Sequence, residues 1–524
     1  MKTEGTTAEA PTGAMGHRQV LESLSGLLLA LLVAMISSTV VSTALPLIIG
    51  SLNGSQTQYT WVVTATLLAA TATTPIWGKL ADLFNKKTLV QVAIVLFVIG
   101  SMISGFSQNT GQLIAARAFQ GIGVGGLQAL VQVVIAAIIP PRERGRYNGY
   151  LGAVMAVATV GGPLLGGLIV DVPWLGWRWC FFVGVPIAVL AFIVLQRTLK
   201  LETVRRDDVQ VDYLGAGLIA AGVSVLLIWV SFVGNSFDWL SWQTAAMVAG
   251  GVVLLAVAVL VERKVREPVV PLHIITQRTP ALAIIASLAV GMAMFGGAVF
   301  LGQYFQVGRG YSPTEAGLLT IPLMAGVLVS STVTGRLISR SGSIKPYIVA
   351  GTITLVIGFL GLGTVDHASP LWLVGIAMAI VGIGVGMTMQ NLVLAVQNTV
   401  PLRDLGSASA SVTFFRSLGG TIGVSVLGAV LANRVTADLS TALHVPAGQS
   451  TGSVSALNLK ALPPEIQTVV HTVYGDATAH IFLISAAVGV VGVIAALLLK
   501  PLTLRTTLDV ETKTEEPASD PVAG

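Results

Sequence analysis

Two arginines inside long apolar runs are the residues of this sequence best suited to chemistry. Arg117 lies several residues inside the run 112–139, and Arg416 lies inside the run 406–432. A charge is costly within hydrocarbon, so an embedded arginine normally faces a cavity or a polar partner. The alternatives are that Arg117 extends to the extracytoplasmic interface and that Arg416 anchors its helix near the cytoplasmic side.

No carboxylate accompanies these arginines near the middle of an apolar run, since Asp82, Asp171 and Glu315 all lie at run ends. The polar side chains available to line a cavity are therefore uncharged. They are Ser37, Thr39, Ser42, Gln128, Gln132, Gln390, Asn391 and Gln397. Each can equally satisfy a hydrogen bond between helices. As a set they suit a neutral or weakly acidic amphiphile better than a dication.

Motifs typical of enzymes are missing from the sequence. It has no Gly-x-x-x-x-Gly-Lys-Ser/Thr loop, no metal-spaced cluster and no nucleophile triad. The one cysteine, Cys180, cannot form an intrachain disulfide. We therefore predict a protein that is not an enzyme and holds no cofactor.

The composition predicts an all-α polytopic membrane protein. Of 524 residues, 54% are hydrophobic and only 10% are charged, whereas soluble domains carry about 25% charged residues. Apolar runs of membrane-spanning length recur along the chain. We predict fourteen spans, at 24–49, 60–81, 88–106, 112–139, 148–170, 178–198, 213–233, 243–262, 280–303, 315–338, 346–364, 371–398, 406–432 and 478–499.

Alternate loops differ in charge, which predicts the orientation in the membrane. Basic residues gather in one set of loops, which includes Lys86, Lys87, Arg142, Arg144, Arg146, Lys200, Arg205, Arg206, Arg263, Lys264, Arg266, Arg340, Lys345 and Arg403. By the positive-inside rule these loops and both termini are cytoplasmic. The net charge of +5 thus reports topology, and we expect no nucleic-acid partner.

The charged stretch 78–87 closes the second span and opens the third. Gly78 permits close helix approach, and Asp82 suits the positive end of another helix, for which the helix starting near Gly406 is the candidate. Asn85 tolerates the left-handed conformation of a tight turn. The alternative is a solvated turn whose charges, including Lys86 and Lys87, only set topology.

A weaker copy of this stretch at 335–339 indicates an internal repeat, with Ser339 in the place of Asp82. Eight spans separate the copies, as expected for two six-helix halves with two helices inserted between them (6+2+6). The predicted parts are a tail at 1–23, a bundle at 24–198, an insert with linkers at 199–279, a bundle at 280–499 with an outer loop at 433–477, and a disordered tail at 500–524.

The fifth span carries Gly162-Pro163 followed one turn later by Gly166-Gly167. Small residues allow close backbone contact, and a proline inside a helix removes one hydrogen bond and permits a kink. We expect this helix to pack closely against a neighbour.

Taken together, these stretches resemble the fourteen-helix drug:proton antiporter family of the major facilitator superfamily. The resemblance lies in 78–87, 117–121, 162–167, 177–182, 211–215 and 310–317, and it covers roughly residues 24–500. One departure is Ser37, which stands where the family often has aspartate in the first span.

The resemblance implies a secondary active transporter in the plasma (inner) membrane, which we expect to be a monomer surrounded by membrane lipids. It would export lipophilic compounds such as drugs or antibiotics by alternating access, driven by proton entry. Arg117 and Arg416 would then serve in coupling, while Gly78, Asp82, Lys86, Lys87, Gly162, Pro163, Gly166 and Gly167 would serve in gating. Because Ser37 replaces the acid, the alternative is a lipid or metabolite transporter weakly coupled or uncoupled to protons. A receptor or scaffold would need a larger interaction domain than this chain shows.

Overall fold

The computed structural model describes residues 17–54, 56–172, 174–199, 212–234, 237–265, 267–442 and 464–506. Thirteen helices of these segments are long and apolar enough to cross a membrane. The threonine-rich α2 (Gln56–Leu83) packs among them as a fourteenth long helix. Three of its threonine hydroxyls, those of Thr66, Thr73 and Thr74, donate to carbonyls of the same helix, as in the 2.7 Å bond from Thr74 Oγ1 to Ala70 O, which lowers the cost of burying them.

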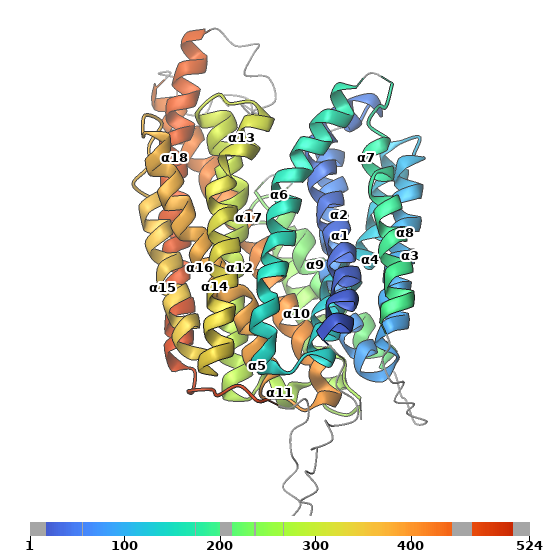
Figure 1. Cartoon of the computed structure of the whole chain (residues 1–524). Helices are drawn as coiled ribbons and strands as arrows, with labels where there is room; N and C mark the ends of the chain where they lie inside the picture. The colour runs from blue at the N-terminus through green and yellow to red at the C-terminus, as the bar shows by residue number, and fades with distance from the viewer. Residues whose placement is uncertain are drawn as a thin grey trace, which may run out of the picture.

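The first group of helices lies on one side of the molecule (Figure 1). It comprises α1 (His17–Ser51), α2, α3 (Lys86–Gly105), α4 (Thr110–Ile138), α6 (Asn148–Asp171), α7 (Trp179–Phe182) and α8 (Gly184–Thr198). Their buried apolar side chains form two clusters, one built around Leu27, Phe97 and Leu130 and the other around Leu45 and Phe181. We call this group the N-half.

The second group, the C-half, has one large apolar core of its own. It comprises α12 (Arg278–Gln303), α13 (Pro313–Leu319), α14 (Ile321–Ser341), α15 (Lys345–Leu362), α16 (Leu371–Gln397), α17 (Leu405–Ala442) and α18 (Pro464–Leu498). Between the halves in sequence lie α9 (Tyr213–Phe232) and α10 (Trp242–Glu262). A separate apolar cluster joins these two helices to α2 and α17 through Ala72, Ile219, Ala258 and Phe414.

Several predicted span boundaries differ from the structure. The predicted span 178–198 is divided into α7 and α8, and 315–338 into α13 and α14, where Pro322 stands in the first turn of the second piece. Asn85 is not left-handed: its φ is −62°, and its side chain caps α3 by accepting from the backbone N–H of Lys87 and Thr88. The predicted tails and linker at 1–16, 200–211 and 507–524 lie outside the described residues.

The predicted outer loop 433–477 is helical at both ends. Helix α17 continues to Ala442 and α18 begins at Pro464, while 443–463 lie outside the described residues. Polar residues continue these helices because Leu439 and Val470 pack with Val307 beyond the apolar spans. Hydropathy marks the part of a helix in lipid, and it says little about where the helix ends.

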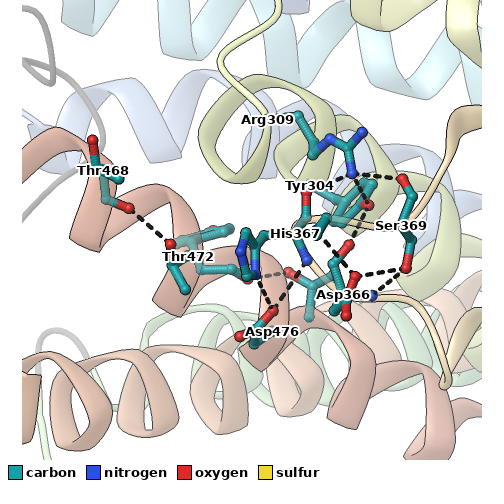
Figure 2. A network of polar contacts seen from close by, with 11 residues as sticks. Tyr304, Arg309, Asp366, His367, Ser369, Thr468, Thr472 and Asp476 are labelled. Carbon is teal, nitrogen blue, oxygen red and sulfur yellow. Dashed lines mark hydrogen bonds and ion pairs between the residues drawn. The ribbon is translucent and has the colours of Figure 1, made fainter.

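The extension of α18 is fixed to the C-half by a polar network (Figure 2). Asp476 accepts from the backbone N–H of His367 at 3.0 Å and contacts its ring Nδ1 at 2.9 Å. Arg309 donates to the carbonyls of His367 and Ser369 at 2.5 and 2.8 Å, and Tyr304 donates to the carbonyl of Asp366 at 2.8 Å. The extension is therefore a docked element of the C-half.

The opposite end of the molecule carries α5 (Pro141–Arg144) and the start of α17, and we call it the basic end (Figure 1). Residues 500–506, predicted as part of a disordered tail, run across it. Leu504 N donates to Gly342 O at 2.8 Å, and Arg142 N donates to Arg505 O at 3.1 Å. Arg505 also donates to the carbonyls of Gln397 and Val400. This segment thus touches both halves.

Candidate functional site

Asp82, at the end of α2, is bound to the N-terminus of α17. Its carboxylate accepts from the backbone N–H of Gly406 at 2.6 Å and of Ser407 at 2.8 Å, and the Ser407 hydroxyl also donates to it. The first N–H groups of a helix have no partner within the helix and carry a partial positive charge, so a carboxylate is stabilised there. The contact with the helix starting near Gly406 is confirmed, while the gating role of Asp82 stays a prediction.

Two glycines let the backbones of α2 and α17 approach each other at this contact. A Cβ atom on Gly78 would overlap Ala410 Cβ and lie 2.7 Å from Gly406 O. A Cβ atom on Gly406 would overlap Gly78 O. Any larger side chain at either position would therefore push the helices apart. The Asp82 carboxylate would then move away from its donors on α17.

Lysines flank the Asp82 contact and tie it to neighbouring elements. Lys87 Nζ donates to the carbonyl of Gln196 at the end of α8 at 2.8 Å, and the charge of Lys86 acts on Asp82. Lys79, which sequence reasoning did not single out, is buried and forms an ion pair with Glu267 in the linker after α10. This pair connects the inserted helices to the same end of α2.

The sequence repeat at Gly335 makes the corresponding contact with different chemistry. A Cβ atom on Gly335 would overlap Gly145 O, so the end of α14 touches the short 3-10 turn Gly145–Tyr147 before α6 as closely as α2 touches α17. Ser339, in the place of Asp82, has a buried hydroxyl with no partner. Arg142 instead donates to the carbonyls of Ser339 and Arg340, both at 3.2 Å, at the negative C-terminal end of α14.

Amide side chains join the two halves further inside the molecule. Gln132 Nε2 donates to Gln390 Oε1 at 2.8 Å, and Asn148 Nδ2 donates to Asn391 Oδ1 at 3.3 Å. Arg144 Nη1 donates to Gln397 Oε1 at 2.9 Å. Four residues predicted to line a cavity thus make interhelical hydrogen bonds, which is the alternative that the sequence left open: Gln132, Gln390, Asn391 and Gln397. Arg142 and Arg144 had been interpreted only as topological charges.

Gln128 is placed differently from the other amides. It lies one turn from Gln132 on the same face of α4, towards the end away from α5, and is only half-buried. Ser42 is exposed and donates to the carbonyl of Ser38 in its own helix. These two remain candidates for lining a cavity.

Arg117 is enclosed within the N-half, only 3% exposed. Its Nη1 donates to Gln120 Oε1 at 2.6 Å, and Gln120 Nε2 donates to Ser101 Oγ at 2.6 Å and Ser37 Oγ at 3.2 Å. Ser37 therefore belongs to the arginine network rather than to an open wall. The interpretation of Arg117 as extending to the interface does not fit this burial.

Arg416, also buried, lies in the C-half, away from the end of its helix. Its Nη1 makes a long contact of 3.4 Å to Met389 O, and its own backbone is so close to Gly291 that a Cβ there would overlap Arg416 O. Among the described residues neither intramembrane arginine forms an ion pair. Their coupling roles stay predictions.

The Gly-Pro motif of α6 packs on both sides. A Cβ atom on Gly162 would overlap Thr39 Oγ1 of α1, and that hydroxyl donates to Ala158 O at 3.0 Å. Pro163 lies beside Gly317 of the C-half: a Cβ atom added to Gly317 would stand 3.5 Å from the Cβ of Pro163. Gly166 is buried, and a Cβ on Gly167 would stand 3.7 Å from Thr314. Helix α6 therefore lies between α1 and the C-half.

We expect Gly162→Ala to reduce transport several-fold. The added methyl group overlaps a β-branched threonine that has little rotamer freedom in a helix, and overpacking of this kind costs about 1–3 kcal/mol. Gly161→Ala is the matched control, because a Cβ there meets no atom within 4 Å. Initial rates in membrane vesicles check this, and equal rates for the two variants would contradict the packing role.

Comparison with known sequences matches a profile of the Major Facilitator Superfamily to residues 27–212 and 213–424. An uncharacterised MFS-type transporter of Mycobacterium tuberculosis is 35% identical over 480 residues, which is 92% of this chain and 69% of the relative. The multidrug transporter protein MdtP of Bacillus subtilis is 34% identical over 81% of this chain and 77% of the MdtP chain. The efflux pump dotC of Dothistroma septosporum is 32% identical over 97% of this chain and 88% of the dotC chain.

Solved structures share the fold at low sequence identity. The proton:xylose symporter XylE superposes with a TM-score of 0.61 at 15% identity, covering 94% of this chain and 98% of its own. The human organic anion transporter MFSD10 gives the same TM-score at 13% identity, covering 92% and 99%. At this identity the likeness concerns the fold alone.

Proposed function

Because the chain belongs to the major facilitator superfamily, we propose that it is a secondary active exporter of lipophilic or amphiphilic compounds, driven by proton entry. Relatives named as a multidrug transporter and as an efflux pump, each over 30% identical across most of this chain, support the export of drug-like substrates. The observation that carries the proposal is the closure between the halves at the basic end.

The basic end is the cytoplasmic end in this proposal, in the plasma membrane. Lys86, Arg142 and Arg340 gather there, as the positive-inside rule requires. Both ends of the described chain lie there too, because Ser23 of α1 donates to Thr198 O of α8 and Arg505 bonds to Arg142. Both termini are then cytoplasmic.

The closed basic end corresponds to an outward-facing state. Asp82 on α17, Arg142 on α14, and the amide pairs that join α4 and α6 to α16 hold the halves together on the cytoplasmic side. When these contacts break, Gln132, Gln390 and Asn391 are released from one another. The same amides then line a cavity that opens to the cytoplasm, so one set of residues serves both as gate and as binding wall.

Proton coupling is the part of the proposal with the sharpest test. In proteoliposomes with an internal pH-sensitive dye, addition of a lipophilic substrate should move protons against the substrate flux, and a protonophore should abolish accumulation. A panel of dyes and antibiotics in an efflux-deficient strain, with and without the protonophore, identifies the substrate first.

A second candidate function is transport of a lipid or metabolite without proton coupling. Ser37 favours it, because a serine hydroxyl bonded to Gln120 cannot carry a proton as a carboxylate does. Transport that continues unchanged after the pH gradient has collapsed would establish this alternative and reject antiport.

A further inference from the structure

Arg117 is a buried cation whose charge no described residue neutralises. Its hydrogen-bond partner is the neutral Gln120 amide, and its Nε is buried without a hydrogen-bond partner. The ion pairs among described residues involve other cations, namely Lys79, His367, Arg403 and Arg434. An uncompensated charge in such surroundings is strongly destabilising, so a counter-charge is expected.

The surroundings of Arg117 offer further donors for an anion. Ser104 of α3 is completely buried and its hydroxyl also has no partner. Helices α3 and α4 are antiparallel, and a Cβ on Gly100 would lie 2.6 Å from Gln120 Cα. Ser104 stands four residues from Gly100, and Arg117 three residues from Gln120, towards the same end of the bundle. The free hydroxyl and the free Nε–H are therefore at the same level of the helix pair.

Arg416 shows that this arrangement is particular to Arg117. Arg416 also lacks a described carboxylate partner, but none of its nitrogens is both buried and unpartnered. The Arg117 group, in contrast, is enclosed by α1, α3 and α4 of one half. Because Arg117 is only 3% exposed and α3 and α4 pack closely at Gly100, the acidic group of a drug-sized substrate is excluded, and the counter-charge has to come from a small ion.

We propose that a small monovalent anion, chloride in the cell, binds beside Arg117 and provides its counter-charge. Arg117 Nε–H and the Ser104 hydroxyl donate to it, while Gln120 holds the arginine in place through Ser101 and Ser37. The site is a structural part of the transport unit, whatever the transported compound and its driving ion. Export by this protein then depends on chloride.

Ser37 provides a substitution that tests the charge alone. Its hydroxyl lies 3.2 Å from Gln120 Nε2, within the network that ends on Arg117. Ser37→Asp places a fixed carboxylate in this network, which should replace the ion. Ser37→Asn has nearly the same size without the charge and is the matched control.

The experiment begins with protein purified throughout in sodium gluconate, so that chloride is absent. Addition of about 100 mM chloride should raise the Tm of the wild type and of Ser37→Asn by about 3 °C. Ser37→Asp should start at a higher Tm and show no response. In proteoliposomes, export by the wild type should fall about tenfold in gluconate, while export by Ser37→Asp should not depend on the anion.

Two results would overturn the proposal. One is a wild-type Tm that is the same in gluconate, chloride and bromide, which would mean that the arginine is neutralised by water and dipoles alone. The other is that crystals of the wild type grown in bromide show no anomalous bromide signal beside the Arg117 side chain. Both measurements use no transported substrate, so failure of the proposed export function would not affect them.

Discussion

Asp82→Asn is expected to open the basic end and to reduce export at least tenfold. The carboxylate accepts two backbone hydrogen bonds and one hydroxyl hydrogen bond at the positive end of α17. Loss of its charge weakens charge-assisted bonds worth about 3 kcal/mol together, which shifts the balance between closed and open forms by about 100-fold. The amide can still accept, so the helices should remain folded.

Distances between spin labels measure this shift directly. Phe84, exposed at the end of α2, and Arg403, exposed before α17, take labels as cysteines in a Cys180→Ser background. The distance between them should lengthen in Asp82→Asn. Ser339→Ala is the matched control, because its position repeats that of Asp82 but its hydroxyl bonds to nothing. An unchanged distance in Asp82→Asn with full export would remove Asp82 from the gate.

Arg117→Ala is expected to abolish export while the protein stays folded. The substitution removes the cation and the bond that fixes the Gln120 amide oxygen, so the network that joins α1, α3 and α4 through Gln120 loses its charged member. Truncation also removes a buried charge, which limits the loss of stability. We therefore expect a functional loss larger than the structural one.

Export of a dye from membrane vesicles, together with Tm and size-exclusion profiles, separates the two effects. Arg434→Ala serves as the control, since its pair with Asp438 is exposed and worth under about 1 kcal/mol. Arg117→Gln keeps the polar contact with Gln120 and covers the case in which the alanine variant is unstable. Full export by both folded Arg117 variants would exclude a role for this residue.

Sequence reasoning found the contact between Asp82 and the helix starting at Gly406 because both partners carry local signals. An acid after a glycine and a helix start are each visible within a few residues. The contact between Arg142 and the end of α14 was not predicted, although its partners are closer in sequence, because neither partner carries such a local signal. A basic loop residue looks the same in sequence whether it sets topology or binds carbonyls.

The amides illustrate the same limit. Gln132 and Gln390 were recognised as polar residues inside helices, which is unusual enough to draw attention. Their partners, however, are each other across the two halves. Lys79 and Glu267 likewise pair between α2 and the linker after α10, and neither position has a local signal that favours the other.

By itself the sequence determined the helical class, the number and approximate position of the spans, and the two intramembrane arginines. These follow from local hydropathy, because each helix in lipid must satisfy its own backbone. Only the tertiary structure decided that the predicted cavity amides form hydrogen bonds between the two halves, that Ser37 belongs to the Arg117 network, and that α17 and α18 continue beyond their apolar spans. Those features depend on which helices pack together, and pairing across hundreds of residues leaves no periodic trace in one sequence.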